Sequence, residues 1–123
     1  MERDPLTEKV IGCAIEVHRI LGPRLLESAY EQCLARELAL QGIGFGLQVP
    51  VPVIYKGTRL DCGYRIDVLV EKQLILELKS VESISGIHKA QILSYMKLAE
   101  IHTGLLMNFN VELMKNGISR FKL

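Results

Sequence analysis

Hydrophobic positions recur with a helical period in the first third of the chain. Over residues 6–21 apolar side chains return every three or four positions, as in an amphipathic helix. Asp4 followed by Pro5 is typical of a helix N-terminus, and Gly22-Pro23 ends the stretch. A second helical pattern covers residues 25–41. Two antiparallel helices are therefore predicted.

The period changes at Phe45, where short strand-like runs begin. Pro50 and Pro52 confine the first run to a sheet edge, because proline cannot donate to a strand ladder. Lys56-Gly57 predicts a hairpin turn. The chain is expected to be β-rich as far as Lys79.

The last third predicts a helix over residues 85–100 and then an apolar strand over 105–111. Asn116-Gly117 favours a tight hairpin into a final strand. The order is ααβββ(β)αββ, and no linker or low-complexity segment divides it. We expect one α/β domain over residues 1–123.

Composition excludes several classes of protein. With 49% hydrophobic and 24% charged residues the chain resembles an average globular domain, and its net charge of +1 means that any nucleic-acid contact must be local. Glycines and prolines interrupt the longest charge-free run, and no signal-peptide pattern opens the sequence, so no membrane contact and a cytoplasmic location are expected. Three cysteines outside Cys-x-x-Cys spacing indicate buried free thiols. Seven Tyr and Phe residues and no Trp offer little for an aromatic platform.

Candidate chemistry is concentrated in residues 64–79. If residues 71–73 form a three-residue hairpin loop, the apolar rows of the two strands face one core. The opposite face then pairs Asp67 with Glu77 and Arg65 with Lys79. Two opposed carboxylates repel each other unless a cation lies between them, and Mg²⁺ prefers such oxygen ligands.

The alternative is an ordinary solvated face on which the opposite charges of these four residues compensate. Glu-x-Lys is a short and common pattern, so spacing alone favours this alternative. Leu69 and Ile75 share the same face, however, and apolar side chains there indicate a half-buried cleft.

Several segments together resemble the PD-(D/E)xK nuclease superfamily, and within it the GxxExxY proteins. The segments are Leu21-Gly22-Pro23-Arg24-Leu25-Leu26-Glu27-Ser28-Ala29-Tyr30, Gln48-Val49-Pro50-Val51-Pro52-Val53, Tyr64-Arg65-Ile66-Asp67, Glu77-Leu78-Lys79, Gln91 with Tyr95, and Asn108-Phe109-Asn110. The resemblance implies a restriction-endonuclease-like core, with a mixed central sheet flanked by helices. One position departs from the motif, because Arg24 replaces the glycine three residues before Glu27.

The resemblance also implies a role for each matching residue. Mg²⁺ or Mn²⁺ would be held by Asp67, Glu77 and the backbone carbonyl of Leu78, with Glu27 reaching in from the second helix. Lys79 would be the catalytic lysine. Gln91, on the third helix, would support Lys79 or the substrate, and Tyr95, four residues later, would share its face. The site predicted in this way consists of Glu27, Asp67, Glu77, Leu78, Lys79, Gln91 and Tyr95.

Other roles remain open for some of these residues. Glu27 and Tyr30 can instead be a first-turn acid and a core aromatic, and Gln91 and Tyr95 can be the polar edge of an amphipathic helix. His88 could contact phosphate or carry a proton. His18 and His102 are expected to be structural or exposed. The side chain of Arg24 could either narrow a cleft or bind phosphate.

The combined interpretation is a Mg²⁺-dependent phosphodiesterase that acts on nucleic acid by metal-assisted hydrolysis. Substrate affinity would come from a local basic cluster, and a homodimer would double that surface. The candidate cations are Arg24, Arg65, Lys89 and Lys97. The alternatives are a nuclease-like binding module without turnover and a structural subunit of a larger assembly.

Overall fold

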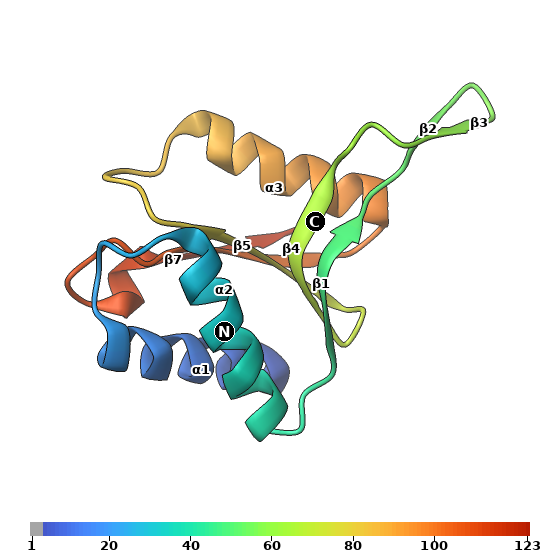
Figure 1. The fold of residues 1–123 in the computed structure, drawn as a ribbon. Coiled ribbons are helices and arrows are strands. Elements are labelled where there is room, and N and C mark those ends of the chain that lie inside the picture. Colours follow the sequence, from blue (N-terminus) through green and yellow to red (C-terminus); the bar gives the residue numbers. More distant parts are fainter. Residues whose placement is uncertain (1–3) are drawn as a thin grey trace.

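The computed structural model describes residues 4–123 and has a three-layer arrangement. Helices α1 (Pro5–Leu21) and α2 (Glu27–Leu40) lie on one face of a central sheet, and α3 (Gly86–Ala99) covers the other (Figure 1). The strands are β1 (Phe45–Pro50), β2 (Val53–Tyr55), β3 (Thr58–Leu60), β4 (Arg65–Val70), β5 (Leu74–Lys79), β6 (Thr103–Asn108) and β7 (Ile118–Lys122). No helix within residues 4–123 is long and apolar enough to cross a membrane.

The central sheet has five strands in the order β1-β4-β5-β6-β7. Only β5 and β6 pair in parallel, and α3 is the crossover between them. The other neighbours are antiparallel. The predicted mixed α/β class is therefore confirmed, and β1, with Pro50, lies at the predicted edge. Strands β2 and β3 form a separate hairpin that projects from the body of the domain (Figure 1).

Two apolar clusters lie on opposite faces of the sheet. The larger joins α1 and α2 to the inward rows of β4, β5 and β6, including Val68, Val70 and Leu76. The smaller packs α3, through Ile92 and Met96, against the other face. Because the central strands are covered on both sides, polar side chains within them lie in a dry environment.

Side chains cap the N-termini of α1, where the cap was predicted, and of α3, where it was not. The carboxylate of Asp4 accepts hydrogen bonds from the Leu6 amide (3.1 Å) and the Thr7 hydroxyl (2.8 Å). Helix α3 begins after Ser85, whose amide donates to Nδ1 of His88 at 3.1 Å. His88 therefore closes the N-terminus of α3 through the nitrogen that faces Ser85.

Two details of the predicted fold are wrong. Asn116-Gly117 does not form a two-residue hairpin, because the connection before β7 is a 3₁₀ helix (Met114–Gly117) that buries Met114 in the core. Ile66 was expected to share a core with Val68, but it belongs to the α3 cluster. The strands change faces beside Gln48, whose backbone is left-handed at φ 50°.

Tyr30 connects the N-terminal helices to the end of the sheet. Its ring stacks on Phe109 with the centroids 4.4 Å apart and the planes inclined by 12°. Its hydroxyl donates to the Gly22 carbonyl at 2.6 Å and accepts from the Leu25 amide at 3.1 Å. The motif tyrosine is thus a core aromatic that fixes the loop between α1 and α2.

We predict that Tyr30→Phe lowers the free energy of unfolding by about 1–3 kcal/mol, because the Gly22 carbonyl and Leu25 amide lose their partner while the ring stack remains. Thermal unfolding measures this. Tyr55→Phe is the matched control, since the Tyr55 hydroxyl makes no hydrogen bond within residues 4–123. Equal melting temperatures for wild type and Tyr30→Phe would contradict this role of the hydroxyl.

Candidate functional site

The predicted pairing of β4 with β5 is present from the loop as far as Val68 and Leu76, but the further predicted pairs, Asp67 with Glu77 and Arg65 with Lys79, are not part of the ladder. Val70 pairs with Leu74 and Val68 with Leu76, as the three-residue loop requires. Beyond Val68, hydrogen bonds from backbone amides to the two carboxylates replace the backbone hydrogen bonds of the ladder. Oδ2 of Asp67 accepts from the Leu78 amide at 2.8 Å, and Oε1 of Glu77 accepts from the Asp67 amide at 3.3 Å. A backbone amide of β5 therefore holds the Asp67 carboxylate, and the backbone amide of Asp67 holds the Glu77 carboxylate.

Glu77 is buried, with 3% of its surface exposed. Burial, and then the charge of Asp67, raise the pKa of the Glu77 carboxyl from 4.5 to about 9. Nearby Lys79 lowers this pKa, but by less than burial and Asp67 raise it. Without a further cation the pair therefore retains one proton at neutral pH, and it cannot be the solvated, charge-compensated face of the alternative interpretation.

Helix α3 supplies the other side of this site. Tyr95 is 6% exposed, and burial raises its pKa, with smaller contributions from the charges of Glu77 and Asp67. The Gln91 amide donates to the Tyr95 hydroxyl at 3.1 Å. The structure thus brings together Asp67, Glu77, Lys79, Tyr95 and, through Tyr95, Gln91.

Two polar residues that the sequence prediction missed complete the support of Asp67. The Gln48 amide donates to Oε1 of Glu31 at 2.6 Å and to Oδ1 of Asp67 at 3.4 Å. Gln48 lies between Leu47 and Val49, which pair with the residues on either side of Asp67. The position of Gln48 as a polar residue within an apolar strand could have indicated that it belongs to the site. No feature of the sequence around Glu31 indicated this.

Glu27 does not join this cluster through a direct contact. It is exposed at the first position of α2 and makes no hydrogen bond or ion pair within residues 4–123. The loop before its helix is nevertheless tied to the segment after Lys79, because the Ser80 hydroxyl donates to the Leu25 carbonyl at 2.6 Å. Glu27 therefore lies at the end of the sheet where β5 ends in Lys79.

Asn108 fixes the segment that follows Lys79. Its buried side-chain oxygen accepts from the Val81 and Asn110 amides at 3.1 and 3.2 Å, and its amide donates to the Val81 carbonyl at 2.9 Å. The Phe109 amide donates to the Lys79 carbonyl at 2.9 Å. The Asn108-Phe109-Asn110 segment is thus a scaffold that holds the end of β5.

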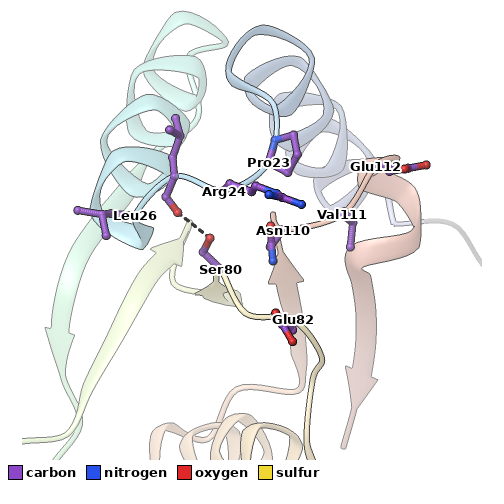
Figure 2. Close-up of a pocket in the computed structure, with 9 residues that line it drawn as sticks. Pro23, Arg24, Leu26, Ser80, Glu82, Asn110, Val111 and Glu112 are labelled. Atoms are coloured by element: carbon purple, nitrogen blue, oxygen red, sulfur yellow. Dashed lines mark hydrogen bonds between the residues drawn. The ribbon is translucent and has the colours of Figure 1, made fainter.

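Arg24 has a left-handed backbone, with φ 74°. Glycine adopts this conformation without strain, which explains why a glycine suits the first motif position and why a side chain there is costly. The Arg24 side chain extends over a cavity of about 710 Å³ at the α2 end of the site (Figure 2). Ser80, Glu82, Asn110 and Glu112 also line that cavity.

The remaining candidate cations do not form one cluster. Arg65 is 3.4 Å from Asp61, Lys97 lines a second cavity beside Tyr95, and Lys89 is exposed on α3. Arg24 lies at the first cavity. Of these four cations, Arg24 lines the first cavity and Lys97 the second, whereas Arg65 and Lys89 line neither.

The positions of the two remaining histidines and of the three cysteines are as follows. Nε2 of His18 is 2.7 Å from the Val111 carbonyl, and His102 is exposed. Cys13 is buried as expected, Cys33 is half-buried, and Cys62 is exposed, so the expectation of buried thiols is wrong for Cys62.

Comparison with protein families gives one match that covers nearly all of these elements. The model of the PD-(D/E)XK nuclease superfamily matches residues 4–121. The chain belongs to the PD-(D/E)XK nuclease superfamily. Its five-stranded mixed sheet flanked by three helices is consistent with the restriction-endonuclease-like fold. Comparisons with curated proteins and with solved structures gave no significant match.

Nucleases of this superfamily generally use divalent metal ions, and the acids present here fit such an ion in part. Within residues 4–123 no three His, Cys, Asp or Glu side chains are close enough to enclose a metal. Asp67 and Glu77 nevertheless form a like-charged pair that a divalent cation would relieve. Mg²⁺ is commonly held by one or two carboxylates, with waters and substrate phosphate as its other ligands, so two acids are sufficient.

We predict that the metal-free protein loses stability as the pH rises from about 4.5 to about 9. The folded state binds the Glu77 proton more tightly than the unfolded chain, so this stabilisation is complete below 4.5 and is lost through the folded pKa. Glu77→Gln keeps a side-chain acceptor for the Asp67 amide but cannot ionise, and it should flatten this dependence. Thermal unfolding in EDTA at several pH values measures it.

Glu82→Gln is the matched control, because it removes the same charge from an exposed position and should leave the pH dependence unchanged. Parallel pH profiles for wild type and Glu77→Gln would show that the buried proton is not on Glu77.

We predict that Arg24→Gly raises the free energy of unfolding by up to about 1 kcal/mol, because glycine relieves the left-handed backbone. Arg24→Ala is the control, since it removes the side chain but keeps the strain. Chemical denaturation distinguishes the two variants. Equal stability of Arg24→Gly and Arg24→Ala would show that the backbone of Arg24 is not strained.

Proposed function

We propose that this domain is a metal-dependent nuclease of the GxxExxY branch, which hydrolyses phosphodiester bonds in nucleic acid. The observation that carries the proposal is the buried Glu77 beside the half-buried Asp67, with hydrogen bonds from backbone amides to both acids and Lys79 nearby. A buried carboxyl whose pKa is raised, as that of Glu77 is, costs stability, and such costs are concentrated at functional sites. Membership of the nuclease superfamily supports the same reaction.

Asp67 and Glu77 would hold Mg²⁺ or Mn²⁺, together with the backbone carbonyl of Leu78. The amide of Leu78 points toward Asp67, and in a strand the carbonyl of a residue points to the same side as its amide. The carbonyl of Lys79 points the other way, because it accepts from Phe109. When bound, the ion would activate water and offset charge on the phosphate.

Lys79 would stabilise the negative charge that develops on the phosphate. Its ammonium is close enough to Glu77 to affect the Glu77 pKa, and it cannot ligate a metal while protonated. Tyr95 accepts from Gln91 and keeps its own hydroxyl hydrogen, which can be donated to a phosphate oxygen or a carboxylate. Gln91 would therefore orient Tyr95.

Glu27 would act from the N-terminus of α2, where it is free to approach a bound substrate or ion. Arg24, three residues earlier, would contact a phosphate from the rim of the first cavity. In this proposal the cost of the left-handed Arg24 backbone is retained because the guanidinium binds substrate.

A nuclease-like binding module without turnover is the second candidate. Arg24 is the observation that favours it, because the motif glycine is missing and a side chain extends over the cavity. Purified protein assayed against single- and double-stranded DNA and RNA, with Mg²⁺, Mn²⁺ or EDTA, distinguishes the two. Cleavage that EDTA abolishes supports the nuclease, and metal-independent binding without cleavage supports the module.

We predict that Lys79→Met lowers the single-turnover cleavage rate by on the order of 10² or more, while Mn²⁺ binding is retained. Methionine keeps much of the apolar stem but removes the charge, so the fold should survive. Calorimetric Mn²⁺ titration measures binding beside the cleavage assay.

Lys72→Met is the matched control, because Lys72 lies in the loop at the opposite end of the same β4–β5 hairpin. Wild-type cleavage by Lys79→Met would remove Lys79 from the mechanism. Any activity that survives in both Lys79→Met and Glu77→Ala would belong to a contaminant.

A further inference from the structure

A second cavity adjoins the proposed site on its α3 side. Its volume is about 490 Å³, and its walls combine two tyrosine rings, aliphatic side chains and a few polar groups. It is lined by Val53, Tyr64, Gln91, Ser94, Tyr95, Lys97 and Leu98. Small-molecule sites have this size and composition, with polar groups that fix the orientation of a largely apolar ligand.

Tyr64 is the exposed wall of this cavity. Its surface is 44% exposed, and its ring centroid is 5.9 Å from that of Tyr95, with the planes inclined by 51°. The charges of Glu77 and Asp67 in turn contribute to the raised pKa of Tyr95. The cavity therefore adjoins the acids through Tyr95, which lines it.

The β2–β3 hairpin continues this surface away from the sheet. It carries exposed Ile54, Tyr55 and Leu60, and the Lys56 ammonium lies 5.4 Å from the centre of the Tyr55 ring. Residues 53–65 contain three basic side chains and one acidic side chain, in a chain whose net charge is only +1. The acidic one, Asp61, already pairs with Arg65.

We propose that this cavity receives one unpaired base of a nucleic-acid strand, with the base against the ring of Tyr64 and the flanking phosphates along Lys97 and the hairpin cations. The proposal rests on the proposed nuclease function and specifies its substrate as single-stranded or frayed nucleic acid. Only seven Tyr and Phe residues are present, but two of the four tyrosines meet here.

The geometry favours an unpaired base over a base pair. Within a duplex both faces of a base are covered by its neighbours, so Tyr64 could stack on it only after unstacking. Any unpaired base has a free face, and aromatic stacking with basic side chains along the backbone is the usual way to bind single strands. The surplus of positive charge on the hairpin favours a polyanion over a second copy of this chain.

Binding of fluorescein-labelled single strands and duplexes, measured by anisotropy in EDTA, tests the proposal. We expect single strands to bind more tightly than duplex, and Tyr64→Leu to weaken single-strand binding about tenfold with no change for duplex. Tyr64→Phe retains the ring and should bind as the wild type does. Parallel DNA and RNA strands identify the sugar that the site accepts.

Tyr64→Leu should keep the fold, because the hydrogen bonds of Tyr64 are made by its carbonyl, which accepts from the Val51 amide (3.0 Å) and Nη1 of Arg65 (2.9 Å). A thermal melt verifies this. As a second readout, a 2-aminopurine base in the strand should lose fluorescence on binding to wild type and Tyr64→Phe, but not on binding to Tyr64→Leu.

Three results would overturn the inference: unchanged single-strand binding by Tyr64→Leu, equal loss for single strands and duplex, or a dimer in sedimentation that Tyr64→Leu dissociates without affecting nucleic acid. Cleavage of nucleic acid by wild type with no effect of Tyr64→Leu would reject this site and leave the nuclease function intact. Single-strand binding that depends on Tyr64, without any metal-dependent cleavage, would reject the nuclease function and leave this site intact.

Discussion

The structure depends on a local change of hydrogen-bond acceptors where the β4–β5 ladder ends. Two carboxylates take the place of backbone carbonyls, so Asp67 binds the Leu78 amide and Glu77 binds the Asp67 amide. This arrangement satisfies the buried amides but places like charges together in a dry environment. A proton can neutralise the pair, and so can a divalent cation. The proposed nuclease chemistry is the second of these solutions.

The rest of the domain holds the two strands in this arrangement. Tyr30 and Phe109 stack beneath the end of the sheet, and Asn108 fixes the segment after Lys79. Helix α3 covers the other face with Tyr95. Tyr30, Asn108 and Phe109 belong to the segments that carry the family resemblance, but they act as scaffold. They matter for function because they determine where the Lys79 ammonium and the Asp67 carboxylate lie.

The strand register could be predicted from sequence because side chains alternate along a strand. The apolar rows and a three-residue loop were sufficient to predict the pairs from Val70–Leu74 to Val68–Leu76, which bring Asp67 beside Glu77 just past the end of the ladder. Leu69 and Ile75 indicated only a half-buried cleft on this face, and the nearly complete burial of Glu77 could not be predicted, since α3, which packs on that face, is distant in sequence. The left-handed backbones of Gln48 and Arg24 also escaped prediction, because both residue types ordinarily avoid that region. The change of face at Ile66 beside Gln48 was missed with them.

Anomalous scattering from crystals grown with Mn²⁺ tests the central claim most directly, because it locates the ion without reference to activity. We expect a peak in contact with carboxylate oxygens of both Asp67 and Glu77 and with the Leu78 carbonyl, and no peak there in crystals of Asp67→Asn. A peak elsewhere on the domain, or no peak between these two acids at saturating Mn²⁺, would contradict the claim that they form a metal site.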